Sequence, residues 1–335
     1  YKANPSVSHF AQVSPDDGGF LLSNLKNRRN KILNRPRSLS PRKQRQLMEK
    51  RGIIFPKNTH KQDAEKIQEI GYYKLKEFAI PFSVKKGKRL RYKNLTFANL
   101  LKRYYQDKNL RIYLLHAIEN VEVYLNNLIA TLLGDKYGAF GYLEFKEWCD
   151  RSIPKFEIEE KQFYFKNNLL KEMKRSNLPD IKAPNNQNED GFPSVWTMVD
   201  CLTFGESIFL FSIMSKKNKE KISNVFDLTP RELYSCLKCL NMIRIVCCHN
   251  SNLIDISIRT RSSMPHKYKN VLFKVNGNYT NRVALVITLV KYFLNKINPK
   301  YNFNNIYYAL QSLIDNDDNE AHRLGFKNKN AIKFL

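Results

Sequence analysis

Apolar residues recur every three or four positions along most of the chain, which is the spacing of helices that bury one face. The longest such stretch runs from Phe97 to Leu133 without glycine or proline, and it follows Thr96, a residue type that caps helices. We predict one long helix there, or two helices divided near 107–109, with a stop at Gly134. Since no stretch alternates apolar and polar residues for long, the pattern predicts an all-α protein.

Shorter stretches with the same period predict further helices between residues that cap or break helices. These helices are expected from Ser40 to Gly52, over 62–80 with a weak point at Gly71, over 161–173, from Ser194 to Gly205, over 208–214, from Thr229, over 283–294 and over 307–313. The basic segment 85–92 is expected to form a loop or short hairpin, and 178–193 a polar loop. The sequence Thr-Pro-Arg-Glu from Thr229 is interpreted as a capping box one residue short.

Composition narrows the class of protein. The chain of 335 residues is 42% hydrophobic, which is enough for a large core, and its net charge is +26. So much positive charge implies a polyanionic partner, such as RNA, DNA or an anionic membrane surface. The sequence contains no run of about eighteen apolar residues and no apolar signal-peptide core, so we expect no membrane span or leader. Six cysteines in this length fit reduced thiols in a cytoplasm.

Positive charge is densest near the start of the chain. Residues 24–51 include eleven basic residues and one acid, Glu49, and prolines at 36 and 41 interrupt any helix. We therefore predict a basic arm over 1–45 and a helical domain over 46–335. The alternatives for the arm are phosphate contacts and a solvated segment without that role. Its candidate RNA contacts are Arg28, Arg29, Arg35, Arg37, Arg42 and Lys43.

The segment 244–250 (Arg-Ile-Val-Cys-Cys-His-Asn) closes the helix that starts near Thr229. Arginine can hold a phosphate through two contacts, and histidine can move a proton near neutral pH, so Arg244 and His249 are candidate catalytic residues for RNA cleavage. Five residues on an ideal helix place two side chains about 140° apart. Either the helix ends before His249, or two protomers pool their residues, and we hypothesise the homodimer. Spacing alone also fits a surface arginine and a helix-terminal histidine.

The sequence gives weaker evidence for other kinds of functional site. Cys236 and Cys239 form a Cys-x-x-Cys pair that precedes 247–249 (Cys-Cys-His), so a zinc site must be weighed. The pair lies inside one apolar helical pattern, which favours buried thiols on a helix face. Glu119 and Glu122 are interpreted as partners of neighbouring bases, not as a catalytic acid pair. The sequence contains no Gly-rich phosphate loop or comparable motif, and we expect neither metal nor cofactor.

Five short segments, in order, carry a resemblance to a known family. They are 70–75 (Ile-Gly-Tyr-Tyr-Lys-Leu) with Pro81-Phe82, 110–111 with 118–122 (Ile-Glu-Asn-Val-Glu), Trp196 with Phe204-Gly205, 243–250, and 324–326 (Leu-Gly-Phe). Over roughly residues 46–330 the chain resembles the bacterial abortive-infection Abi family of the AbiD/AbiF type. That family belongs with the HEPN helical-bundle ribonucleases, whose mark is Arg-x4–6-His.

The resemblance implies a HEPN-like helical bundle, here with additional helices and the basic arm. It also implies metal-independent RNA cleavage, usually at a dimer, in anti-phage or toxin–antitoxin settings. Arg244 and His249 are the positions that carry the family's motif, and Asn250 is an auxiliary candidate where the family has a second histidine. The chain departs at Ile245, where the family has asparagine, and at Asn252, where an arginine is often found.

Two other functions stay open at this point. The departures and the positive charge also suit a protein that holds a structured noncoding or guide RNA without cutting it. A DNA-binding regulator is a third alternative, but we find no convincing helix-turn-helix.

Overall fold

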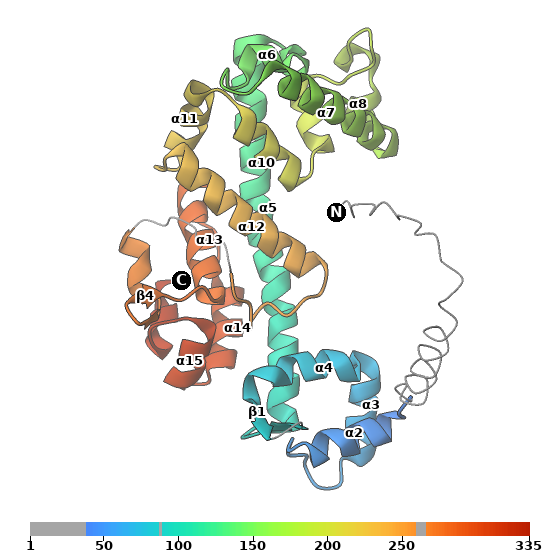
Figure 1. Cartoon of the computed structure of the whole chain (residues 1–335), viewed down its shortest axis with the longest axis vertical. Helices are drawn as coiled ribbons and strands as arrows, with labels where there is room; N and C mark the ends of the chain where they lie inside the picture. Colours follow the sequence, from blue (N-terminus) through green and yellow to red (C-terminus); the bar gives the residue numbers. More distant parts are fainter. Residues whose placement is uncertain (1–37, 87–88, 259–265) are drawn as a thin grey trace, which may run out of the picture.

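One helix, α5 (Phe97–Tyr137), runs the length of the molecule, and the other elements pack around it (Figure 1). The computed structural model describes residues 38–86, 89–258 and 266–335. Thr96 caps α5 by accepting a hydrogen bond from the Asn99 N–H, and the helix continues without a break for about 60 Å. It ends at Gly138, so the predicted stop at Gly134 is wrong. A side chain at 134 would meet the Trp196 ring, and this packing explains the glycine.

The elements before α5 gather around its N-terminal end (Figure 1). They are α2 (Pro41–Lys50), α3 (His60–Ile70), α4 (Tyr72–Ala79), the 3-10 turn η1 (Ile80–Phe82) and the hairpin of β1 (Ser83–Lys86) and β2 (Arg89–Tyr92). Gly71 takes a φ of 97° and separates α3 from α4, as its weak point in the helical pattern predicted. A buried ion pair of Arg45 and Asp63 joins α2 to α3.

The elements that follow α5 begin at its far end and return along it (Figure 1). They are η2 (Gly141–Leu143), α6 (Phe145–Trp148), α7 (Lys155–Arg175), α8 (Pro179–Lys182), η3 (Pro184–Asn186), α9 (Val195–Met198), η4 (Val199–Cys201), α10 (Phe204–Ile213), α11 (Lys216–Val225) and α12 (Pro230–Cys248). Packed against α5 are α9, α10, α11 and α12.

Capping boxes decide where two of these helices begin. The single helix expected from Ser194 to Gly205 is wrong, because Thr203 and Glu206 form a capping box that starts α10 afresh. Thr229 and Glu232 likewise form a complete box at the start of α12, not a shortened one. In both cases the two side chains satisfy backbone N–H groups that the first helical turn leaves unpaired.

The C-terminal elements reach α5 through two of their helices. They are η5 (His266–Val271), β3 (Lys274–Val275), β4 (Asn278–Tyr279), α13 (Val283–Ile297), α14 (Asn304–Ile314), α15 (Asp318–Leu324) and η6 (Lys329–Phe334). Helices α13 and α14 both contact α5, and buried apolar side chains from all parts of the described chain form one core. The strands form only short antiparallel hairpins, so the all-α prediction is confirmed.

The length of α5 does not make it a membrane span. Charged side chains, among them Arg103, Asp107 and Arg111, interrupt its apolar residues. Within the ranges that the structure describes, no helix has both the length and the apolar character needed to cross a membrane.

Candidate functional site

Helix α12 ends at Cys248, so His249 is its C-cap and lies outside the regular helix. Asn250 follows with a φ of 55°, and the Ser251 N–H donates to the Val246 carbonyl at 3.1 Å. The Asn250 N–H donates to the Cys247 carbonyl, which completes a Schellman motif with asparagine in the left-handed position. The structure therefore shows the first of the two expected geometries, in which the helix stops before His249.

Arg244 lies one turn before the end of α12 and contacts α5. Its Nε donates to Glu122 Oε2 at 2.8 Å, and the side chains are 34% and 13% exposed, respectively. Partial burial raises the pKa of Glu122 although Arg244 opposes that shift. The interpretation of Glu122 as a partner of a base is thus confirmed, whereas Glu119 forms no ion pair with any described residue. Because the contact uses Nε, the terminal amino groups of the guanidinium form the edge that suits a phosphate.

His249 is exposed to solvent, next to the exposed Cys248. In the described part of the chain its imidazole makes no hydrogen bond, and the ion pair of Arg244 is formed with Glu122. The structure places both side chains at the same end of α12, with Arg244 held by α5 and His249 open to a ligand. This arrangement suits a histidine that transfers protons to and from a bound substrate.

Asn250 is held from two other helices. Arg111 on α5 donates from Nη1 to Asn250 Oδ1 at 2.8 Å, and Lys74 on α4 donates to the Asn250 carbonyl. Lys74 and Arg111 belong to segments 70–75 and 110–111, so three separated segments of the sequence pattern meet here. Lys74 and Arg111 were not predicted as site residues, and their place in those segments was the available signal. The auxiliary role predicted for Asn250 stays a prediction.

The cysteines near the site are mostly buried. Cys236, Cys239 and Cys247 lie on the inner face of α12, and burial raises the pKa of each thiol to about 12. This confirms the interpretation of these thiols as buried helix-face side chains. Among the described residues, the structure holds no group of three or more side chains that could bind a metal ion.

The predicted RNA contacts of the arm fall partly outside the structure. Arg28, Arg29, Arg35 and Arg37 lie outside the described residues. Arg42 and Lys43 are exposed in the first turn of α2, and the predicted boundary at residue 45 falls inside this helix. Both are therefore accessible to a polyanion.

Comparison with known families identifies a match over the region that carries the candidate site. The model of the family described as "Abi-like protein" matches residues 65–255, which is more than half of the chain. The chain belongs to this family. The match covers α4, α5, α12 and the loop through Asp255, and it leaves α13–α15 outside. No curated protein and no solved structure matches the chain.

Three other histidine side chains of this Abi-like protein lie in the described residues, and they have contacts within the fold or face solvent. His116 Nδ1 lies 2.8 Å from the Tyr301 hydroxyl, and His322 stacks on Phe273. His60 is exposed, while His9 and the side chain of His266 lie outside the described residues.

Proposed function

We propose that this Abi-like protein is a metal-independent endoribonuclease of the HEPN type, within the AbiD/AbiF group, that acts in an abortive-infection or toxin–antitoxin system. The observation that carries the proposal is the pairing of an anchored Arg244 with an exposed His249 at one helix end, inside a region that matches the family. The net charge of +26 supports RNA as the substrate. Cleavage of cellular or phage RNA would place the protein in the bacterial cytoplasm.

The reaction uses the 2′-hydroxyl of the RNA as nucleophile. Its oxygen forms a bond to the adjacent phosphorus, the bond from phosphorus to the 5′-oxygen breaks, and the products are a 2′,3′-cyclic phosphate and a 5′-hydroxyl. One group must accept the 2′ proton and one must donate a proton to the leaving oxygen, and His249 can serve in either role. Arg244 stabilises negative charge on the phosphate oxygens.

A homodimer would supply both proton-transfer groups. Among the described residues that we assign to the site, a single protomer presents only His249 for these roles, whereas a two-fold axis near the end of α12 would bring in a second copy of the residue. Ile245, which is 45% exposed beside Arg244, offers an apolar contact for such a pairing. A strict monomer with full cleavage activity in sedimentation and kinetic measurements would exclude the dimer.

A second candidate function is RNA binding without cleavage, in which the protein holds a structured noncoding or guide RNA. Ile245 favours it, because the family's asparagine at this position offers a polar group that isoleucine cannot replace. The same basic residues would serve both functions, so cleavage itself must separate them.

Cleavage is expected to persist in EDTA and to depend on the 2′-hydroxyl. Incubation of the wild type with an RNA oligonucleotide should give fragments with 2′,3′-cyclic phosphate ends, and a single 2′-deoxy substitution at the cleaved position should block the cut there. Mass spectrometry of the fragments measures both. Fragments with 3′-hydroxyl ends would contradict this chemistry, and tight, salt-sensitive binding without cleavage would favour the second function.

Charge reversal on α2 is expected to weaken RNA binding. In the variant with Arg42→Glu and Lys43→Glu, loss of two phosphate contacts should make the slope of log K against log salt shallower by about 1.4. The matched control is Lys216→Glu with Lys217→Glu, which reverses the same charge in the exposed first turn of α11. Equal weakening in both variants would show that net charge, not α2, determines binding.

A further inference from the structure

Three buried charged residues form a row along α5. Arg103, Asp107 and Arg111 are spaced by four, which puts them on adjacent turns of one helix face, and they are 6%, 0% and 4% exposed. Buried charges are costly unless they are paired and hydrogen-bonded. The groups that pair with these three side chains therefore indicate which part of the structure they stabilise.

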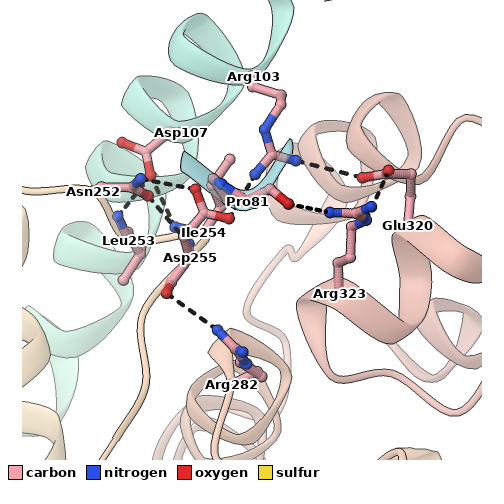
Figure 2. Close-up of polar contacts among 10 residues, drawn as sticks. All are labelled: Pro81, Arg103, Asp107, Asn252, Leu253, Ile254, Asp255, Arg282, Glu320 and Arg323. Atoms are coloured by element: carbon pink, nitrogen blue, oxygen red, sulfur yellow. Dashed lines mark hydrogen bonds and ion pairs between the residues drawn. The ribbon is translucent and has the colours of Figure 1, made fainter. Parts of the chain in front are cut away.

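The row holds the segment that follows His249. Asp107 Oδ1 accepts hydrogen bonds from the backbone N–H groups of Leu253 and Ile254, at 2.8 and 3.0 Å (Figure 2). Asp107 Oδ2 accepts from Arg111 Nε at 2.8 Å, and Arg111 in turn donates to the Asn250 side chain. Burial raises the pKa of Asp107, and these hydrogen bonds oppose the shift.

Arg103, the remaining residue of the row, contacts the end of the same segment. Its Nη2 donates to Asp255 Oδ1 at 2.6 Å, and Asn252 donates to the other carboxylate oxygen at 2.8 Å (Figure 2). Its Nη1 donates to Glu320 on α15 at 3.4 Å. Through Glu320 the row reaches a helix that lies outside residues 65–255.

Residues 250–255 form no helix or strand, so their backbone groups need partners from elsewhere. Leu253 and Ile254 are fully buried, so an unpaired N–H there would lose its hydrogen bonds to water without a replacement. A carboxylate can accept both N–H groups on one oxygen and still bind an arginine with the other, which no neutral side chain does as well. The side chains of the row contact this segment at three points, and the first of these directly follows His249.

We propose that Arg103, Asp107 and Arg111 are positioning residues that fix residues 250–255 and thereby hold His249 at the C-terminal end of α12, the end that also carries Arg244. This inference rests on the proposed function, since positioning matters only if His249 acts on a substrate. Glu320 extends the hold to α15. The site would then depend on α15 although the family match ends at residue 255.

The decisive variant is Asp107→Asn. The amide oxygen can still accept from Leu253 and Ile254, but the amide nitrogen would face Arg111 Nε as donor against donor. Arg111 then loses its anchor and its hold on Asn250. The matched control is Asp63→Asn, which makes the same change in the buried Arg45–Asp63 pair between α2 and α3.

Two measurements separate positioning from general destabilisation. Hydrogen exchange of the backbone amides reports the order of 249–256, and single-turnover kinetics with saturating RNA separate the cleavage rate from the Kd. Asp107→Asn should raise exchange in 249–256 and lower the cleavage rate about 10- to 100-fold, with the Kd changed less than about threefold. Asp63→Asn should lower the Tm by a similar amount, but it should leave the exchange in 249–256, the cleavage rate and the Kd unchanged.

Three outcomes would overturn the inference. They are an equal fall in the cleavage rate for both variants, unchanged exchange in 249–256, and faster exchange with wild-type cleavage. If the wild type does not cleave RNA, the proposed function fails by that result alone. The exchange comparison then still decides whether the row holds the segment that follows His249.

Discussion

Replacing His249 with alanine is expected to lower the rate constant for RNA cleavage by about 10²–10⁴-fold, the usual range for loss of a general acid or base. RNA binding and the free energy of unfolding should change little. The imidazole is exposed, and the backbone N–H of residue 249, which donates to the Ile245 carbonyl, is kept in alanine. Single-turnover kinetics, a binding titration and a thermal melt measure the three quantities.

The control for this substitution is His60→Ala. His60 is likewise exposed, but it lies at the start of α3 and has no part in the site. Its removal should leave the cleavage rate unchanged. If His249→Ala cleaves as fast as the wild type, or if both variants lose activity equally, the catalytic role of His249 is wrong.

The sequence predicted those parts of the fold that depend on local signals. Thr96, Pro41 and Gly71 each mark a helix boundary through a cap, a fixed φ or a left-handed conformation, and the structure has boundaries at all three. The apolar period identified most helices for the same reason. The capping boxes at 203 and 229 are equally local signals, but the first was overlooked and the second was misjudged as one residue short.

Other boundaries depend on distant residues. The stop predicted at Gly134 failed because the glycine makes room for Trp196, which lies 62 positions further along the chain. The alternative break near 107–109 does not occur, and α5 continues through Asp107. Asp107 is tolerated inside α5 because Leu253 and Ile254, 146 and 147 residues away, supply its hydrogen bonds. Periodicity within a window cannot reveal such partners.

The candidate site was predictable in its key residues but not in its supports. The family-like segment 243–250 identified Arg244 and His249, and the charge pattern suggested that Glu122 pairs with a base. The identity of that base and the cap formed by Asn250 could be known only from the folded structure. The spacing of Arg103, Asp107 and Arg111 by four was visible in the sequence, but only burial distinguishes such a row from a solvated helix face.

Arg103→Ala is expected to cost about 3–5 kcal/mol of the free energy of unfolding, as is typical when one partner of a buried ion pair is removed. Arg103 has a side chain only 7% exposed and lies between Asp255 and Glu320, which are 20% and 23% exposed. Without the guanidinium these carboxylates repel each other in a partly buried site. Denaturant titration measures the loss.

The loss of stability in Arg103→Ala should also depend on pH. Burial already raises the pKa of Glu320 while Arg323 and Arg103 oppose the shift, so removal of Arg103 raises it further. A carboxyl with a folded pKa above its unfolded pKa destabilises the fold when ionised, and protonation of the folded state relieves this cost. The deficit of Arg103→Ala should therefore be largest at neutral pH and shrink as the pH falls toward 4.5, the ordinary value for glutamate.

Arg282→Ala is the matched control for Arg103→Ala. Arg282 also contacts Asp255, but it is exposed and donates to the backbone carbonyl at 3.4 Å (Figure 2). Its loss should change stability little at any pH, because a long, exposed hydrogen bond to a backbone carbonyl contributes little and water can replace it. A deficit of Arg103→Ala that is equal to the control, or constant with pH, would mean that Asp255 and Glu320 are not held together by Arg103. The link from α15 to the segment after His249 would then have no physical basis.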